Sequence, residues 1–99
     1  MPKKVTLNAS AYCAASCGGN TKTACGATAS TWYTVAAGSS YPMGTILYIP
    51  YFKDQPNGGW FIVQDRGGAI TDNHLDVWMN SLNECVNFGR RNLECYIYE

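Results

Sequence analysis

Apolar side chains occupy every second position from Val5 to Ala11, with polar residues between them. This period of two predicts a strand over residues 5–12. The alternation of apolar and polar residues is absent from residues 13–31, which are rich in Ser, Gly, Thr, Asn and Ala. This composition is typical of a long loop. A short strand is predicted directly after it, over residues 32–36.

The middle of the chain has the pattern of a hairpin. A turn is predicted at residues 42–44, followed by a strand over residues 45–52 (TILYIPYF), in which Pro50 indicates a sheet edge or a bulge. Residues 54–59 (DQPNGG) have the Asn-Gly chemistry of a hairpin loop, and residues 60–64 form the expected return strand.

The last third predicts a strand, a helix and a closing strand. A glycine-containing loop over residues 65–72 leads into a strand over residues 75–79. Ser81 followed by Glu84 is a capping box that begins a short helix, and Gly89 ends it. The apolar face of this helix is expected to consist of Leu82, Cys85 and Val86. Its negative C-terminal end is followed by two cations, Arg90 and Arg91.

Alternation resumes from Leu93 to Tyr98 as the closing strand. Short strands, Gly-rich corners and one helix near the C-terminus predict a mainly β protein with a small barrel. Because the chain has 99 residues, we expect residues 1–99 to form a single domain.

Charge and hydropathy exclude several classes of partner. Seven basic and seven acidic residues give a net charge of zero, which argues against binding to nucleic acid, since that requires a basic surplus. No apolar run is long enough for a membrane span, so we expect no membrane insertion. The start, MPKK, leads at once into the strand pattern without the apolar core of a signal peptide. Either a signal has been removed or the protein crosses membranes by another route.

The chain has five cysteines, so at least one is unpaired within it. There is no Cys-x2-Cys pair, and the only histidine, His74, has no ligand near it in sequence, so zinc is disfavoured. Disulfides suit a secreted protein with a small core, and we expect one bridge among the first three cysteines and one between the last two. The alternative is that they are buried small apolar residues. The five are Cys13, Cys17, Cys25, Cys85 and Cys95.

Three of the seven acidic residues lie in the twelve residues from Asp65 to Asp76, with His74 and aromatic side chains around them. This composition suits the cleavage of sugars, because a glycosidic oxygen leaves readily only when a carboxyl protonates it. An ordinary Asp has a pKa of about 3.9 and is ionised at neutral pH, so a catalytic Asp must be desolvated or lie near another acid. A solvated acidic loop is the alternative, and the spacing of a calcium loop is missing.

Several segments resemble the bacterial 3D domain, a family named for three aspartates. Its pattern is Asp-Thr-Gly-Gly-Ala-Ile-Lys-Gly-x-x-(Ile/Val)-Asp, followed by a helix that ends in Phe-Gly-x-Arg. The matching segments are QDRGGAI at 64–70, NHLDVWM at 73–79, FGRR at 88–91, Pro42-x-Gly44-Thr45, Ala11-Tyr12 and Thr28-Ala29-Ser30. The resemblance implies a six-stranded double-psi β-barrel. It also implies a relation to the catalytic domain of MltA-type lytic transglycosylases, which cut peptidoglycan between N-acetylmuramic acid and N-acetylglucosamine without water.

The resemblance also implies roles for individual residues. Asp76 matches the family's acid/base, and Asp65 matches the first Asp of the block, with a supporting role. The implied partner is the peptidoglycan glycan strand, bound by a monomer in the cell wall or outside the cell, without cofactor or metal. The resemblance also places the hydroxyls of Thr28 and Ser30 at the wall of the groove, and His74 is either a hydrogen-bond partner of a sugar or a solvated loop residue. The candidate substrate-binding residues are Thr28, Ser30, Gly67, Gly68, Ala69, Asp72 and His74.

The chain departs from the pattern at two acidic positions, where it has Ala37 and Asn80. Arg66 and Asp72 also replace the usual Thr and Gly, and Asp72 is a candidate to compensate for the missing charge near the catalytic Asp. A rival interpretation is therefore a non-catalytic, expansin-like module that binds or loosens wall polysaccharide. A third is hydrolysis by Asp65 and Asp76, which requires carboxyls about 6.5–9.5 Å apart. A structural interpretation of Asp65 is a cap on the amides of the following glycines.

Overall fold

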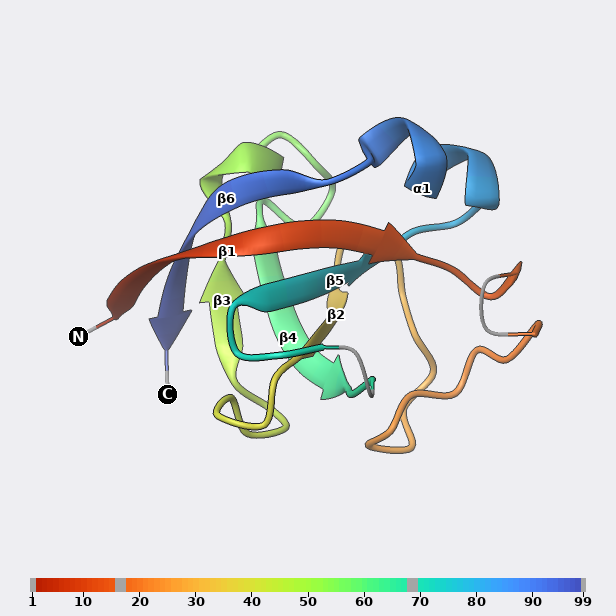
Figure 1. Ribbon diagram of the computed structural model, residues 1–99, viewed down its shortest axis with the longest axis horizontal. Coiled ribbons are helices and arrows are strands. Elements are labelled where there is room, and N and C mark those ends of the chain that lie inside the picture. Colours follow the sequence, from red (N-terminus) through yellow and green to blue (C-terminus); the bar gives the residue numbers. More distant parts are fainter. Residues whose placement is uncertain (1, 16–17, 68–69, 99) are drawn as a thin grey trace.

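The protein is a closed β-barrel in a computed structural model that describes residues 2–15, 18–67 and 70–98 (Figure 1). The strands follow one another around the barrel in the order β1-β5-β2-β4-β3-β6. This confirms the mainly β class with six strands and one α-helix. The elements are β1 (Lys3–Tyr12), β2 (Thr34–Ala37), β3 (Ile46–Tyr48), the 3-10 helix η2 (Pro50–Phe52), β4 (Trp60–Asp65), β5 (His74–Trp78), α1 (Leu82–Phe88) and β6 (Arg91–Tyr98).

Two parallel strand pairs give the barrel its double-psi topology. β1 pairs with β5 and β2 pairs with β4 in parallel, whereas the other four pairings are antiparallel. Parallel neighbours require long crossovers, so strands far apart in sequence lie side by side. As a result β5 lies between β1 and β2, and Asp76 is opposite Ser10 on one side and Ala36 on the other.

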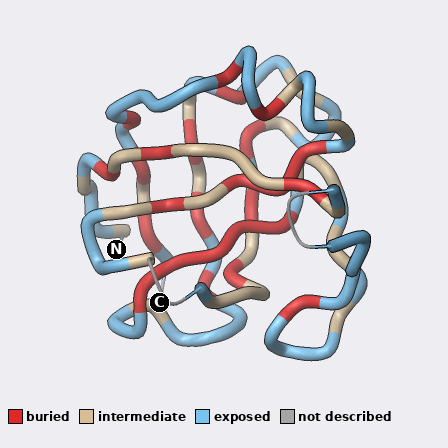
Figure 2. The backbone as a smooth tube through the Cα atoms, turned by 45° about the vertical axis from the view of Figure 1, so that its right-hand side comes forward, coloured by how far each residue is buried: buried red, intermediate tan, exposed pale blue. Residues whose placement is uncertain are grey.

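The core fills the interior of the barrel with alternate residues of several strands, whereas all four residues of β2 are buried. On β5, Leu75 and Val77 are fully buried, whereas His74 and Asp76 alternate with them and are half-buried. Figure 2 shows the buried positions running along the strands, with exposed segments at the turns. The largest fully buried side chains are Phe61, Leu47, Ile49, Leu75 and Ile97.

Two predicted strands are shorter than their hydrophobic patterns suggest. β3 ends at Tyr48, and Pro50 begins the 3-10 turn η2, since proline has a fixed φ and no N–H for a sheet ladder. β2 begins at Thr34, because Trp32 adopts a φ of 67° that no regular strand contains. The predicted loop over 13–31 contains one isolated bridge in its described residues, between Lys22 and Thr28.

The helix has the predicted ends but a different buried face. The Ser81 hydroxyl accepts a hydrogen bond from the Glu84 amide at 3.2 Å, which confirms the cap, and Gly89 follows the last turn with φ 67°. Leu82 and Val86, expected in the core, are 54% and 69% exposed. The buried residues of α1 are Cys85 and Phe88. They face the barrel because Phe88 stacks on Phe52 of η2, with ring centroids 5.7 Å apart.

The expected disulfide between Cys85 and Cys95 is wrong. Both are free, buried thiols, and burial raises the pKa of each to about 12. The Cys85 side chain contacts Cys13, a neighbour that lies far away in the sequence. Cys25 is a free, exposed thiol, and Cys17 lies outside the described residues. Cys13, Cys85 and Cys95 therefore fit the alternative of small apolar core residues.

Candidate active site

Asp76 lies in the middle of β5 and points away from the core. The strand alternation that buries its two neighbours leaves its carboxyl half-buried at the barrel surface. Ser10 of β1, its partner in the parallel register, donates a hydrogen bond from Oγ to Asp76 Oδ1 at 3.0 Å. The two residues are 66 positions apart in sequence, so this contact depends on the barrel topology.

A row of three side chains crosses from β5 to β1 and back. His74 Nε2 lies 2.9 Å from the Ser10 Oγ that donates to Asp76. With Asp76 ionised, Ser10 donates to its Oδ1 and accepts from His74 Nε2–H. The Ser10 hydroxyl thus links the imidazole to the carboxyl, and Asp76 is the candidate acid of this row.

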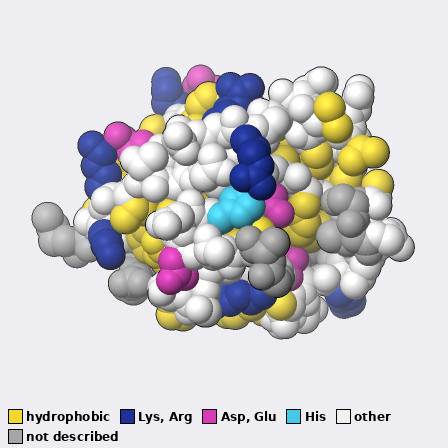
Figure 3. All heavy atoms as spheres, in the orientation of Figure 1, with side chains coloured by type: hydrophobic (Ala, Val, Ile, Leu, Met, Phe, Trp, Pro, Cys, Tyr) yellow, Lys and Arg dark blue, Asp and Glu magenta, His cyan; other side chains and the backbone are white. Residues whose placement is uncertain are grey.

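Burial raises the pKa of Asp76 above its ordinary value, and the Asp65 charge adds to that effect. The hydrogen bond from Ser10 and the electrostatic influence of His74 and Arg90 act in the opposite direction, but desolvation dominates. A carboxyl that keeps its proton at higher pH can serve as a general acid. Figure 3 shows the single histidine in the middle of this face, with acidic and basic side chains beside it.

Asp65, at the end of β4, is held by three hydrogen bonds. Its Oδ2 accepts from the Tyr12 hydroxyl at 2.7 Å, and its Oδ1 accepts from the amides of Ala24 and Arg66, both at 2.9 Å. Asp65 therefore caps backbone amides, as its structural interpretation predicted. The expected donors were the following glycines, whereas the described amide donors are Ala24 and Arg66. It joins β1, the long loop and β4, and its charge acts on Asp76.

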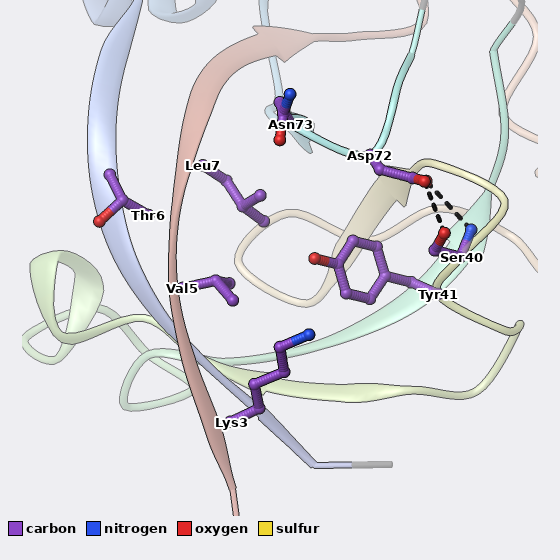
Figure 4. A pocket seen from close by; sticks show the side chains of 8 residues that line it. All are labelled: Lys3, Val5, Thr6, Leu7, Ser40, Tyr41, Asp72 and Asn73. Atoms are coloured by element: carbon purple, nitrogen blue, oxygen red, sulfur yellow. Dashed lines mark hydrogen bonds between the residues drawn. The ribbon is translucent and has the colours of Figure 1, made fainter.

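Asp72 lines a cavity whose lining residues do not include Asp76. The backbone amide and hydroxyl of Ser40 both donate to its carboxylate, and these bonds lower the pKa of Asp72. Figure 4 shows Asp72 and Ser40 at the rim of this cavity, with the Tyr41 hydroxyl pointing across it. Of these two carboxylates, the one that acts on Asp76 is Asp65, so Asp72 does not compensate for the missing family acids. The cavity has a volume of about 460 Å³ and is lined by Lys3, Val5, Thr6, Leu7, Ser40, Tyr41, Asp72 and Asn73.

The other predicted binding residues are distributed over two loops. Thr28 and Ser30 are exposed in the long loop, where Thr28 bridges Lys22 and the Ser30 amide donates to Thr34 Oγ1. Gly67 is exposed after β4. Gly68 and Ala69 lie outside the described residues. Of the predicted binding residues, His74 is the one whose contacts in the structure join it to Asp76.

The two missing acidic positions have structural roles in this chain. Ala37 is buried in the core opposite Leu75, and Asn80 accepts a hydrogen bond from the Thr31 hydroxyl at 2.6 Å. The Arg66 guanidinium, at a position where the family has Thr, donates to the carbonyl oxygens of Ala37 and Tyr41.

Sequence reasoning missed three residues that contact or influence the two central acids: Ser10, Tyr12 and Arg90. The alternation of β1 marks Ser10 and Tyr12 as outward-facing, but only the pairing of β1 with β5 places Ser10 beside Asp76. Arg90 was interpreted solely as a charge at the end of the helix.

Asp72 and Asp76 are expected to affect stability with opposite dependence on pH. The pKa of Asp72 is lowered from 3.8 in the folded state, so its ionised form stabilises the fold above that pH, and the stabilisation is lost as pH falls through the folded-state pKa. The pKa of Asp76 is raised from 3.8, so the fold is favoured when Asp76 is protonated and loses stability as pH rises through the folded-state pKa. At pH 7, Asp72→Asn should lower the free energy of unfolding and Asp76→Asn should raise it.

Urea denaturation of both variants and the wild type across a pH series measures these differences. The Asp76 difference should shrink as pH falls below 3.8, where this carboxyl is protonated in the folded and unfolded states alike, and the Asp72 difference should shrink as pH falls through its lowered folded-state pKa. Differences of the same sign at pH 7 would contradict the two environments described above.

Comparison with known proteins places the barrel in a family. A family profile described as the 3D domain matches residues 33–99, which contain β2 to β6 and both Asp65 and Asp76. Among solved structures, the chain is similar to MltA from E. coli, with a TM-score of 0.59 and 21% identity over 79% of this chain. The chain spans 27% of the length of that protein, and the likeness shows the barrel fold. No curated protein matches the chain. Because the family match covers more than half of its residues, the chain belongs to the 3D domain family.

Proposed function

We propose that this protein is a lytic transglycosylase of peptidoglycan, which cleaves between N-acetylmuramic acid and N-acetylglucosamine in the cell wall, outside the cytoplasm. The observation that carries the proposal is the state of Asp76. It is an outward-facing, half-buried carboxyl whose pKa is raised by burial and whose orientation is fixed by Ser10. Membership of the 3D domain family supports the choice of substrate.

Asp76 performs two proton transfers in the proposed reaction. In its protonated form it gives a proton to the glycosidic oxygen, and the bond between that oxygen and the anomeric carbon breaks. The resulting carboxylate then takes the proton of the hydroxyl on the sixth carbon of the muramic residue. That hydroxyl oxygen bonds to the anomeric carbon and closes a 1,6-anhydro ring. The proton returns to Asp76, so the cycle needs neither water nor a second carboxyl.

The contacts of Asp65 favour this reaction over hydrolysis. A hydrolytic pair needs a second carboxylate that is free to activate water or to attack the sugar. Both oxygens of Asp65 already accept hydrogen bonds, from Tyr12, Ala24 and Arg66. Asp65 therefore supports the site by holding the long loop and by adding negative charge near Asp76.

A second candidate is a non-catalytic module that binds wall glycan, and the presence of Ala37 and Asn80 at acidic family positions favours it. In the described part of the chain, neither side chain takes the place of an acid beside Asp76. Ala37 is buried in the core, and the Asn80 side chain accepts a hydrogen bond from Thr31. Such a module would be retained on peptidoglycan without releasing fragments.

Digestion of purified sacculi in ¹⁸O-labelled water distinguishes the three functions. The expected products end in 1,6-anhydro-N-acetylmuramic acid and carry no ¹⁸O, as measured by mass spectrometry. Reducing ends that contain ¹⁸O would refute the transglycosylase mechanism and support hydrolysis. Sedimentation of the protein with sacculi without fragments in the supernatant would support the binding module.

A further inference from the structure

Two positively charged or ionisable side chains flank Asp76 on its exposed face. His74 lies two residues before it on β5, and Arg90 follows α1. The Arg90 guanidinium donates to Asn8 Oδ1 at 2.8 Å, and Asn8 of β1 is the register partner of His74. The charges of both side chains act on the Asp76 carboxyl. Arg90, His74 and Asp76 therefore share one small region of the surface above β1 and β5.

The proposed acid step does not explain these two side chains. A cation near a general acid favours its ionised form, so Arg90 and His74 oppose the protonation on which the proposed chemistry depends. Both also occupy positions that the family pattern leaves open: His74 is the x directly before (Ile/Val)-Asp, and Arg90 is the x of Phe-Gly-x-Arg. The family pattern therefore specifies neither residue.

The neighbouring Arg91 shows what a structural arginine looks like in this protein. Its guanidinium lies over the rings of Tyr51 and Phe88, and its Nε donates to the Phe88 carbonyl oxygen at 3.0 Å. Both arginines are exposed, but Arg90 lies over no ring among the described residues, and there its one hydrogen-bond acceptor is Asn8. A guanidinium has five N–H donors, so Arg90 has donors available for a ligand.

We propose that Arg90 and His74 form an anion subsite that binds a carboxylate of the glycan strand beside the cleavage point. This deepens the proposed function and rests on it, because it names the substrate as a glycan bearing free carboxylates and not a neutral N-acetylglucosamine polymer. The planar guanidinium matches a carboxylate with two parallel hydrogen bonds. Since the chain has no net charge, attraction of an acidic glycan has to come from local cations such as these.

Occupation of this subsite would also assist Asp76. A bound carboxylate counters the charges of Arg90 and His74, which are two of the influences that favour ionised Asp76. Substrate binding then makes the protonated, reactive form of Asp76 easier to populate. A neutral glycan would leave the Arg90 charge in place, so discrimination against it would occur in the chemical step as well as in binding.

The test compares two soluble muramic acid-containing oligosaccharides of equal length, one with free lactyl carboxylates and one with those groups amidated. The measured quantity is the ratio of kcat/KM for the acidic substrate to kcat/KM for the amidated substrate. We expect Arg90→Gln to lower this ratio about tenfold, as loss of a charge-assisted hydrogen bond does, and Arg90→Lys to restore part of it. The matched control is Lys53→Gln, which removes an exposed cation next to η2 and should leave the ratio unchanged. An unchanged ratio in Arg90→Gln would overturn the inference.

A binding experiment separates this inference from the proposed catalysis. Calorimetric titration of Asp76→Asn protein with the two oligosaccharides should show about tenfold tighter binding of the acidic one. The additional substitution Arg90→Gln should abolish that preference. If the wild type cleaves nothing but the preference depends on Arg90, the anion subsite holds and the transglycosylase proposal fails. If the wild type cleaves but the Arg90 substitutions do not alter the preference for the acidic oligosaccharide, the transglycosylase proposal holds and the anion subsite fails.

Discussion

Asp76→Asn protein is expected to release fragments from purified sacculi at least about 10³-fold more slowly than the wild type, at the upper end of what general acid–base catalysis contributes. Asparagine has almost the same shape, and its Oδ1 can still accept the hydrogen bond from Ser10. It has no carboxyl proton to give to the glycosidic oxygen and no carboxylate to take one back, so both steps are lost together. The rate is measured as soluble muropeptide by chromatography.

The control for this substitution is Asp54→Asn, the same change at an exposed acid beside Lys53. Its activity should remain within about twofold of the wild type, as is usual for surface changes away from a site. Thermal unfolding of both variants shows whether the fold is intact, and Asp76→Asn should be no less stable than the wild type at neutral pH because it removes a desolvated charge. Equal rates for Asp76→Asn and the wild type would remove Asp76 from the mechanism.

Local patterns in the sequence predicted the strands and the ends of the helix, because these depend on neighbours in the chain. The alternation from Val5 to Ala11 marks the outward face of β1, and Ser81 with Glu84 marks the start of α1. The family motif then identified Asp76. What the patterns lack is the pairing of strands, and the contact between Ser10 and Asp76 exists only because β1 and β5 are parallel neighbours.

The errors have physical reasons that sequence spacing does not reveal. In a helix of seven residues, Cys85 lies three positions from both Leu82 and Phe88, and the large ring of Phe88 decides which face is buried. The spacing of Cys85 and Cys95 permits a reversal of the chain, but the direction of a side chain depends on the barrel. Cys85 faces Cys13, whereas the Cys95 thiol donates to the Leu93 carbonyl oxygen within β6.

Asp65→Ala is expected to lower the free energy of unfolding by at least about 2 kcal/mol. Hydrogen bonds to a charged group contribute about 1.5–3 kcal/mol each, and their contributions are not additive. Asp65 accepts from Tyr12, Ala24 and Arg66, so the change leaves donors in three segments without their acceptor. The long loop should lose its attachment to β4 because the Ala24 amide no longer has an acceptor there. Urea denaturation measures the stability, and hydrogen exchange of the Ala24 amide measures the attachment.

Two milder variants separate the anchor from the charge of Asp65. Asp65→Asn keeps Oδ1 as the acceptor for the amides of Ala24 and Arg66, and its side-chain amide can donate to the Tyr12 hydroxyl. Tyr12→Phe removes one hydrogen bond and leaves the carboxylate. Each should cost less stability than Asp65→Ala, and protection of the Ala24 amide should survive in both. If Asp65→Asn loses sacculus digestion as completely as Asp76→Asn while retaining that protection, Asp65 takes part in the chemistry through its charge, and its assignment as an anchor is insufficient.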